Sequence, residues 1–309
     1  MSLSQLVRRV TRPNYFNNLQ AYYDFCASYL EYIEQGLQAR IVSQNENHYQ
    51  FFQYGKDGHY NVTRPINTSL FCSAENFSTK LELFKNVLSM LRDRERPHDD
   101  TANAFREVVY TLQQSIAVTL DALSAGKSNQ ARKRNGDIFE TLIRLLIQEL
   151  NVICESKVVQ LPILDERGNQ LLTMSFQHDL VVKRENEVKL IGSVKTSSKD
   201  RIDKIFIDKL LFNRMSGCSI PHIAIFLNDV QRKKSKKDNQ YGINATFLAG
   251  HFKAYSIRLT PLDGVYYCDI RPNMVSDEVL SSHIRTIDRA CPKRFLSMIF
   301  PKPVSGSRA

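Results

Sequence analysis

An acidic residue and a lysine that could serve phosphodiester hydrolysis lie close together between residues 176 and 208. Asp179 begins an apolar strand, and Lys195 ends the next strand, two residues after Ser193. A tight RENE turn joins the two apolar segments, which predicts adjacent antiparallel strands on which the carboxylate and the ammonium can meet. Another carboxylate, Asp208, follows thirteen residues after Lys195.

The chemistry that these residue types could support is metal-dependent attack of water on a phosphodiester. That reaction needs a divalent cation to stabilise charge in the transition state and to lower the pKa of the attacking water. Mg²⁺ prefers oxygen ligands and usually takes one or two protein carboxylates, which makes Asp179 and Asp208 candidate ligands. Ser193 and Lys195 share one face of their strand, where the ammonium could orient or help deprotonate the water and neutralise the phosphate. The competing interpretation makes Asp179 a turn or strand-cap residue and Lys195 an edge-strand charge that discourages aggregation.

A third carboxylate, Glu140, is expected on a helix that runs from Asp137 to Leu150. Its neighbours on that helix are apolar: Phe139, Leu142, Ile143 and Leu146. A carboxylate so close to an apolar face is costly unless it is paired with a metal or a cation. The alternative is a boundary glutamate whose carboxylate reaches water.

A short charged cluster follows the lysine: Lys199, Asp200 and Arg201. Arg201 could donate to guanine O6 and N7 while Asp200 accepts from cytosine N4, which would read C·G pairs. An acidic residue in such a cluster favours base contacts, because it would repel phosphates. Alternatively, the cluster is a helix N-terminus at which Asp200 complements the helix dipole.

A second basic run follows an apolar segment at 219–227 and is a candidate contact for the DNA backbone. Its cations are Arg232, Lys233, Lys234, Lys236 and Lys237. Such contacts give salt-dependent affinity without sequence information. The alternative is a solvated loop.

The elements expected before residue 135 are mainly helical. Helices are predicted at 15–41, 78–94 and 100–123, with a short hairpin whose turn is Gly55-Lys56-Asp57-Gly58. The polar, basic stretch 124–135 is predicted to be a linker or a DNA-facing loop.

From residue 135 the expected order is helix, strands, helix, strand. The predicted strands lie at 157–164, 170–176, 179–182 and 188–196, followed by a helix at 200–215 and a buried strand at 219–227. This order is typical of an α/β fold, a mixed sheet with helices on its faces. We therefore expect a helical arm at 1–130 for DNA contact or dimerisation, an α/β core at 131–300 and a disordered tail at 301–309.

Composition is that of a soluble globular protein, with 42% hydrophobic and 24% charged residues. The net charge of +10 favours a polyanionic partner, although many basic proteins bind no nucleic acid. No segment is apolar over the ~20 residues that span a membrane, and the N-terminus lacks a signal-peptide core, which predicts an intracellular protein. The six cysteines are scattered, which argues against a zinc cluster and a disulfide framework.

Together these residues resemble the PD-(D/E)XK nucleases, and more closely the type II restriction endonucleases that recognise CCGG or CCNGG sites. In one branch of that family, serine replaces the second carboxylate of the motif and the missing acid comes from the following helix. Ser193-Val194-Lys195 and Asp208 stand at those places. Lys199-Asp200-Arg201 matches in position an Arg-(Asp/Glu)-Arg cluster that reads C·G pairs, and Glu140 resembles a helix-borne metal ligand of these enzymes.

The resemblance covers residues 135–230, and nothing in 1–125 is diagnostic. Three positions depart from the family pattern. His178 stands where the motif has proline, Asp208 where glutamate is usual, and Lys199 where the reading cluster begins with arginine. The last change removes the planar guanidinium that grips guanine with two parallel hydrogen bonds.

The resemblance implies a restriction-endonuclease-like core and Mg²⁺-dependent cleavage of double-stranded DNA at a C·G-rich palindrome, leaving 5′-phosphate and 3′-hydroxyl ends. Asp179, Asp208 and Glu140 would bind Mg²⁺, Lys195 would orient the attacking water, and Ser193 would hydrogen-bond a water. It also implies a homodimer, or a tetramer of paired dimers, in the cytoplasm of a prokaryote. Two alternatives stay open: a repair or mobile-element nuclease of the same fold that responds to DNA structure, and a non-catalytic DNA-binding protein.

Overall fold

A six-stranded mixed sheet forms the centre of the protein. The computed structural model describes residues 1–56, 59–95, 97–199, 201–234, 240–290 and 296–299. The sheet has the order β12-β11-β8-β7-β6-β5. Its strands are β5 (Ile153–Leu164), β6 (Gln170–Arg184), β7 (Glu187–Ser197), β8 (His222–Asn228), β11 (Gly264–Tyr267) and β12 (Ile284–Thr286). β5, β6 and β7 pair antiparallel, whereas β7, β8, β11 and β12 pair in parallel. The expectation of a mixed α/β sheet is therefore confirmed.

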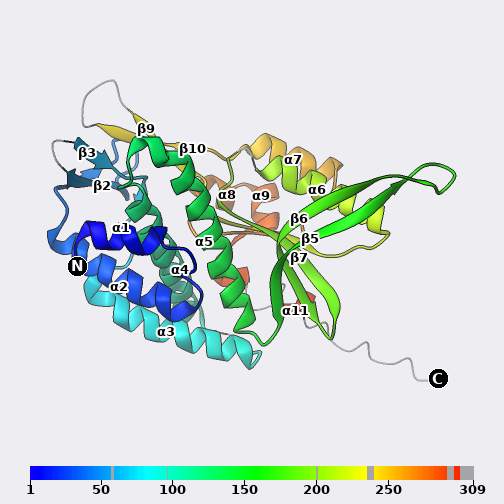
Figure 1. Cartoon of the computed structure of the whole chain (residues 1–309), viewed down its shortest axis with the longest axis horizontal. Helices are drawn as coiled ribbons and strands as arrows, with labels where there is room; N and C mark the ends of the chain where they lie inside the picture. Colours follow the sequence, from blue (N-terminus) through cyan, green and yellow to red (C-terminus); the bar gives the residue numbers. More distant parts are fainter. Residues whose placement is uncertain (57–58, 96, 200, 235–239, 291–295, 300–309) are drawn as a thin grey trace.

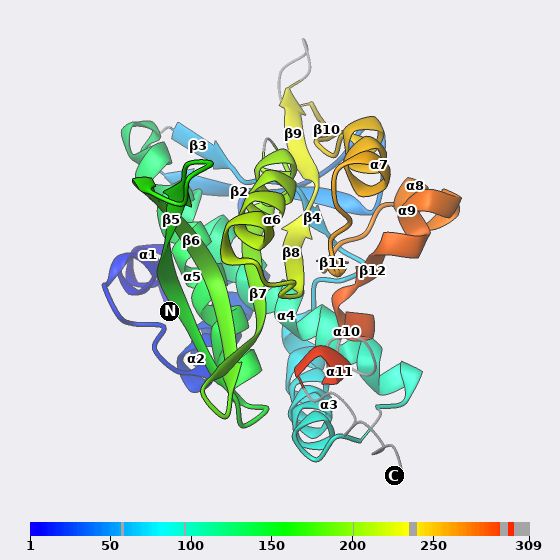
Figure 2. The same ribbon diagram turned by 90° about the vertical axis from the view of Figure 1, so that its right-hand side faces the viewer.

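The central strand β8 explains how the two faces of this sheet are covered. Every residue of β8 is buried, as its apolar sequence HIAIFLN predicts for a central parallel strand. Ile223 and Ile225 pack in the cluster that includes α5 (Ser128–Gln148), whereas Ala224 and Phe226 pack in the cluster that includes α6 (Ile202–Ser216). Figures 1 and 2 show α5 and α6 on opposite faces of the sheet.

β5 and β6 form a long hairpin that projects from the body of the molecule (Figure 1). At its tip, Asp165 accepts hydrogen bonds from the backbone N–H groups of Arg167 and Asn169, both at 2.8 Å, and Gly168 takes a left-handed φ of +83°. This turn separates the strands predicted at 157–164 and 170–176. β6 runs unbroken from Gln170 to Arg184, whereas the sequence predicted two strands.

The N-terminal part combines helices with a small four-stranded sheet. The helices are α1 (Leu3–Thr11), α2 (Leu19–Gln35), α3 (Ala74–Arg92) and α4 (Asp99–Leu120), and the strands are β1 (Ala39–Val42), β2 (Tyr49–Lys56), β3 (His59–Val62) and β4 (Ile66–Asn67). β2 and β3 pair antiparallel, which confirms the predicted hairpin. The largest buried apolar cluster contains residues of α1, α2 and α4 together with residues of α5 and β8, so one core crosses the expected boundary near residue 130.

Two expectations about this region are wrong. The helix predicted at 15–41 ends at Gln35 and is followed by β1. The basic stretch 124–135 was expected as a linker or loop, but α5 begins at Ser128, nine residues before the predicted helix start at Asp137. Its Gln-Ala-Arg-Lys-Arg sequence is rich in good helix formers, and Ala131 and Asn135 are buried against the rest of the protein. Tertiary contacts therefore extend the helix through residues whose charge suggested a loop.

The chain after β8 completes the structure with short elements. These are β9 (Val230–Lys234), β10 (Tyr241–Ala245), α7 (Ala249–Arg258), α8 (Pro272–Ser276), α9 (Glu278–His283), α10 (Ile287–Ala290) and α11 (Leu296–Ile299). The tail predicted at 301–309 lies outside the described residues. Within the described part of the chain, no helix has the length and apolar character that crossing a membrane requires.

Candidate active site

Glu140, Asp179 and Lys195 meet at one point, although they come from three different elements. The Lys195 ammonium on β7 donates to Asp179 Oδ2 on β6 at 2.5 Å and to Glu140 Oε1 on α5 at 3.0 Å. The backbone N–H of Val194 donates to the same Asp179 oxygen at 2.8 Å. The acid and the lysine that the sequence placed on adjacent strands are therefore in direct contact.

Local irregularity of β6 brings Asp179 to this point. Glu155 of β5 pairs with Val181 of β6, and Lys157 pairs with His178. Two residues of β6, Asp179 and Leu180, therefore lie opposite one residue of β5, Ser156. Such a bulge turns a side chain out of the regular alternation of the strand. The pairing of β6 with β7 begins at Leu180, while β7 continues along β8 as far as Ser197. Asp179 and Lys195 thus lie where the two strands separate.

The site is partly open to solvent. The side chains of Lys195 and Glu140 keep 28% and 23% of their surface exposed, whereas that of Asp179 keeps 9%. The Asp179 carboxylate is thus fixed by an ammonium and a backbone N–H, while its two partners are partly exposed to solvent.

The pKa values of this trio show how strongly its charges interact. Burial raises the pKa of Glu140, and the nearby Asp179 carboxylate adds to that effect while Lys195 opposes it. Burial disfavours the charge on Lys195, but the two carboxylates outweigh it and raise the pKa of the ammonium. Lys195 is therefore favoured as a cation in this arrangement. An additional positive charge nearby would stabilise the ionised form of Glu140, which burial and Asp179 disfavour.

Asp208 stands apart from the trio. It lies on α6 and forms an ion pair with Lys204, one turn earlier on the same helix. Burial lowers the pKa of His178, and the negative charges of Asp208 and Asp179 act in the opposite direction. Both carboxylates are thus near the His178 ring, although among the described residues no hydrogen bond or ion pair joins Asp208 to Asp179, Glu140 or Lys195.

His178 itself belongs to the core. Its ring packs edge-on against Phe212 and His222, with centroid separations of 5.0 and 5.7 Å, and is 2% exposed. This position is the one at which the family motif has proline, so the departure is filled by an aromatic packing residue. Ser193 is half-buried on β7 and pairs with Ala224 of β8.

The charged cluster lies at the junction between β7 and α6. The Lys199 N–H donates to Ser197 Oγ at 3.2 Å, and its ammonium donates to Gln231 Oε1 at 3.2 Å. Arg201 is exposed and immediately precedes α6. Asp200 lies outside the described residues.

The second basic run lies on β9 and beyond it. The Arg232 guanidinium donates to the carbonyls of Val62 and Thr63 and lies 5.4 Å from the centre of the Tyr241 ring. Lys233 is exposed, and Lys234 ends β9. Lys236 and Lys237 lie outside the described residues.

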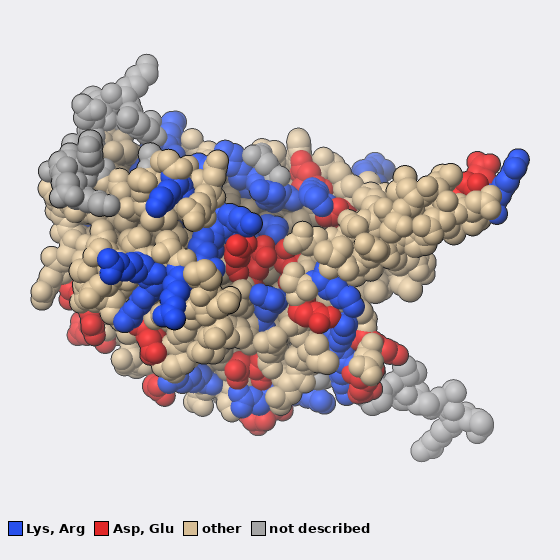
Figure 3. Space-filling view, in the orientation of Figure 1, with Lys and Arg blue, Asp and Glu red and all other residues tan. Residues whose placement is uncertain are grey.

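Basic side chains surround a small acidic area near the middle of the face seen in Figure 3, beside the projecting hairpin. Such a surface attracts a polyanion while keeping carboxylates at its centre.

Sequence reasoning missed the residues that hold the charged cluster in place. Gln231, which contacts Lys199, precedes the basic run, and Thr246 follows β10. Neither residue belongs to a motif, and only the three-dimensional pairing of β9 with β10 brings both to the loop after β7.

The fold resembles that of known restriction enzymes. The sequence matches no protein-family model and no curated protein. Among solved structures, the type IIP restriction endonuclease Kpn2I aligns with a TM-score of 0.70 at 18% identity, over 96% of this chain and 97% of that one. A complex of the restriction endonuclease PspGI with substrate DNA aligns with a TM-score of 0.38 at 12% identity, over 72% and 93% of the chains, which is too distant to support an argument.

The likeness to Kpn2I extends over nearly the whole chain, so the predicted restriction-endonuclease-like fold is confirmed. It includes the N-terminal region, to which the resemblance noted in the sequence did not extend. At 18% identity the likeness concerns the fold alone.

Proposed function

We propose that this protein is a Mg²⁺-dependent type II restriction endonuclease. The observation that supports this most directly is the contact of Lys195 with both Asp179 and Glu140 where β6 and β7 separate. Here two carboxylates share one ammonium in a partly open site, within a fold like that of Kpn2I.

The donor set fits a magnesium ion. Mg²⁺ usually takes one or two carboxylates and keeps water and phosphate oxygens for its other positions. Among the residues that the structure describes, no three His, Cys, Asp or Glu side chains form a ready metal cage. Asp179 and Glu140 would hold the ion, which when bound supplies charge stabilisation and a more acidic water. Asp208 stays a predicted third ligand.

Lys195 acts as a cation in this proposal. Its two carboxylate partners raise its pKa, which favours the protonated form of Lys195 before a metal is bound. Its role is to orient the attacking water by hydrogen bonding and to neutralise a phosphate oxygen. Of the two roles that the sequence left open, orientation is the one that this charge state supports.

Reading of the DNA falls to the loop that follows β7. Lys199 and Arg201 can donate to guanine, and Asp200 can accept from cytosine, at a C·G-rich palindrome of the CCGG or CCNGG kind. Lys233, Lys234, Lys236 and Lys237 would contact the DNA backbone, and Arg232 would hold the paired strands β9 and β10 in place. A palindrome further implies a homodimer or a pair of dimers, acting in a prokaryotic cytoplasm.

The test is cleavage of plasmid and phage DNA with Mg²⁺ or with EDTA. We expect Mg²⁺-dependent double-strand cleavage by the wild-type protein and none by Lys195→Ala. Lys189→Ala is the matched control, because Lys189 lies on the same strand and pairs with Glu187 beside the β6–β7 turn. Lys195→Ala that binds DNA but cuts it at the wild-type rate would overturn the proposal.

A further inference from the structure

We propose that the N-terminal sheet β1–β4 sets the sequence specificity of this protein, by positioning Lys199 in the loop after β7 through the β9–β10 hairpin, with Gln231 and Thr246 as the positioning residues. This inference rests on the proposed function, because it assigns DNA reading to that loop. It gives the N-terminal region a role in reading DNA without touching a base.

The first step is the attachment of the loop to the base of the hairpin. Gln231 on β9 accepts a hydrogen bond from the Lys199 ammonium at 3.2 Å. The Thr246 hydroxyl donates to the Asp229 carbonyl at 2.7 Å and lies 3.5 Å from Ser197 Oγ. Ser197 Oγ in turn accepts from the Lys199 N–H. The Lys199 side chain is therefore held by the hairpin itself, and its backbone by Ser197 of β7, whose hydroxyl contacts Thr246 at the end of the hairpin.

The second step is the attachment of the hairpin to the N-terminal sheet. Asn45, between β1 and β2, forms two hydrogen bonds of 2.9 Å with the backbone N–H and carbonyl of Ile243 on β10. The Gln44 N–H donates to the Tyr241 carbonyl at 3.0 Å. Arg232 on β9 reaches back to the Val62 carbonyl.

Apolar packing supports these bonds. Val230 and Ile243 of the hairpin form one buried cluster with Tyr49 and Phe51 of β2. The hairpin is thus docked on the sheet by both polar and apolar contacts, at positions on each of its two strands.

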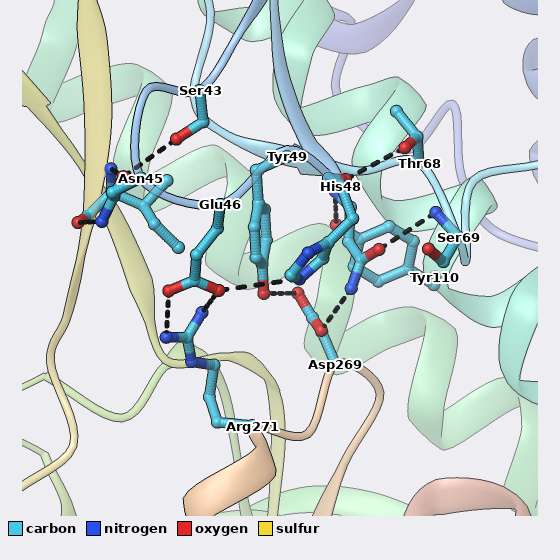
Figure 4. A network of polar contacts seen from close by, with 12 residues as sticks. Ser43, Asn45, Glu46, His48, Tyr49, Thr68, Ser69, Tyr110, Asp269 and Arg271 are labelled. Atoms are coloured by element: carbon cyan, nitrogen blue, oxygen red, sulfur yellow. Dashed lines mark hydrogen bonds and ion pairs between the residues drawn. The ribbon is translucent and has the colours of Figure 1, made fainter.

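The third step fixes the N-terminal sheet to the core, in the network of Figure 4. Arg271 forms two hydrogen bonds with Glu46, of 2.6 and 2.5 Å. The buried Asp269 carboxylate accepts from the Tyr49 hydroxyl and the Asn67 amide, both at 2.8 Å. Asp269 follows β11. Because β11, β8 and β7 run parallel, Asp269 and the loop after β7 both lie at the carboxyl ends of these strands.

A rigid route thus runs from the core through the N-terminal sheet and the hairpin to Lys199. Specific hydrogen bonds to bases require donors held in a narrow geometry. Loss of the hairpin contacts should therefore weaken discrimination between related DNA sites more than it weakens the chemistry at Lys195.

The experiment compares Gln231→Ala, Thr246→Val and Thr246→Ser with the wild type. Asn244→Ala is the matched control, because Asn244 is an exposed amide directly opposite Gln231 on the same hairpin. Rates of cleavage are measured on the protein's own site and on duplexes with single base-pair changes in it. We expect Gln231→Ala and Thr246→Val to lower the preference for the correct site about tenfold or more, and Thr246→Ser and the control to keep it. Wild-type preference in both Gln231→Ala and Thr246→Val would overturn the inference.

A second measurement separates this inference from the proposed function. Asn45→Ala should speed hydrogen exchange at the Lys199 amide, because the hairpin loses its two hydrogen bonds to the Asn45 side chain, and this measurement needs no DNA. Unchanged exchange at Lys199 would overturn the positioning route even if the protein cuts DNA. Faster exchange in a protein that cuts no DNA would support the route and refute the proposed function, and with it the role in specificity.

Discussion

Asp229 should make the protein less stable as the pH rises towards neutrality. This residue joins β8 to β9 and is 1% exposed, and neither of its carboxylate oxygens has a hydrogen-bond partner among the described residues. Burial raises its pKa to about 7, with Arg271 opposing the rise and Asp269 adding to it. The protonated form is therefore favoured in the folded protein.

The size of the effect follows from that pKa. A rise from 3.8 to about 7 is about 3 units, which at about 1.4 kcal/mol per unit corresponds to about 4 kcal/mol. Between these two values the folded protein binds a proton that the unfolded chain has lost, so stability falls with increasing pH. Below pH ~4 both states are protonated and above pH ~7 both are ionised, so the change is confined to this window.

The substitution Asp229→Asn isolates this contribution, because an amide has nearly the same shape and no charge. We expect the variant to gain free energy of unfolding relative to the wild type, by about 2 to 3 kcal/mol more at pH 8 than at pH 5. Denaturant unfolding at the two pH values measures it, since other titrating groups are shared by the two proteins. An equal difference at both pH values would refute the reasoning.

Four further predictions concern the site and the thiols. Lys195→Ala should lower the cleavage rate at saturating Mg²⁺ about a hundredfold or more, measured in single turnover. Because burial and Asp179 raise the pKa of Glu140, protons should compete with the metal there: the Mg²⁺ concentration for half-maximal rate should rise as the pH falls, and Glu140→Gln should abolish that dependence. Asp208→Asn should lower cleavage about tenfold if it is a ligand, as predicted, whereas Lys204→Ala, which removes only its ion pair, should leave the rate unchanged. Among the described cysteines, Cys218 alone is exposed and should react first with a thiol reagent, as mass spectrometry of the labelled protein would show.

Much of the site could be predicted because its residues lie on elements with clear local signals. The RENE turn fixes the pairing of β6 with β7, and the structure gives Glu185 and Asn186 left-handed φ values of 52° and 65° there. That pairing begins at Leu180 and so brings Asp179 to the part of β7 that holds Ser193 and Lys195, whereas the bulge in β6 that turns the Asp179 side chain has no local signal. Glu140 follows from the apolar periodicity of α5, which leaves its carboxylate at the edge of the buried face.

Other features depend on contacts that are distant in the sequence. The start of α5 is decided by the burial of Ala131 and Asn135 rather than by local composition. The role of Arg232 as a tie between β9 and β3 is invisible in a run of basic residues that suggests DNA. The network around Asp269 joins residues about two hundred positions apart, so no local pattern could indicate it.

The central claim is that this protein cuts DNA at a defined C·G-rich sequence, and sequencing the ends of its products tests it most directly. Phage DNA is digested with the wild-type protein and Mg²⁺, and every fragment end is read. Our account predicts discrete fragments whose ends share one palindromic C·G-rich sequence and carry a 5′-phosphate. Fragment ends without a common sequence, or intact DNA under conditions in which the folded protein binds it, would contradict the account.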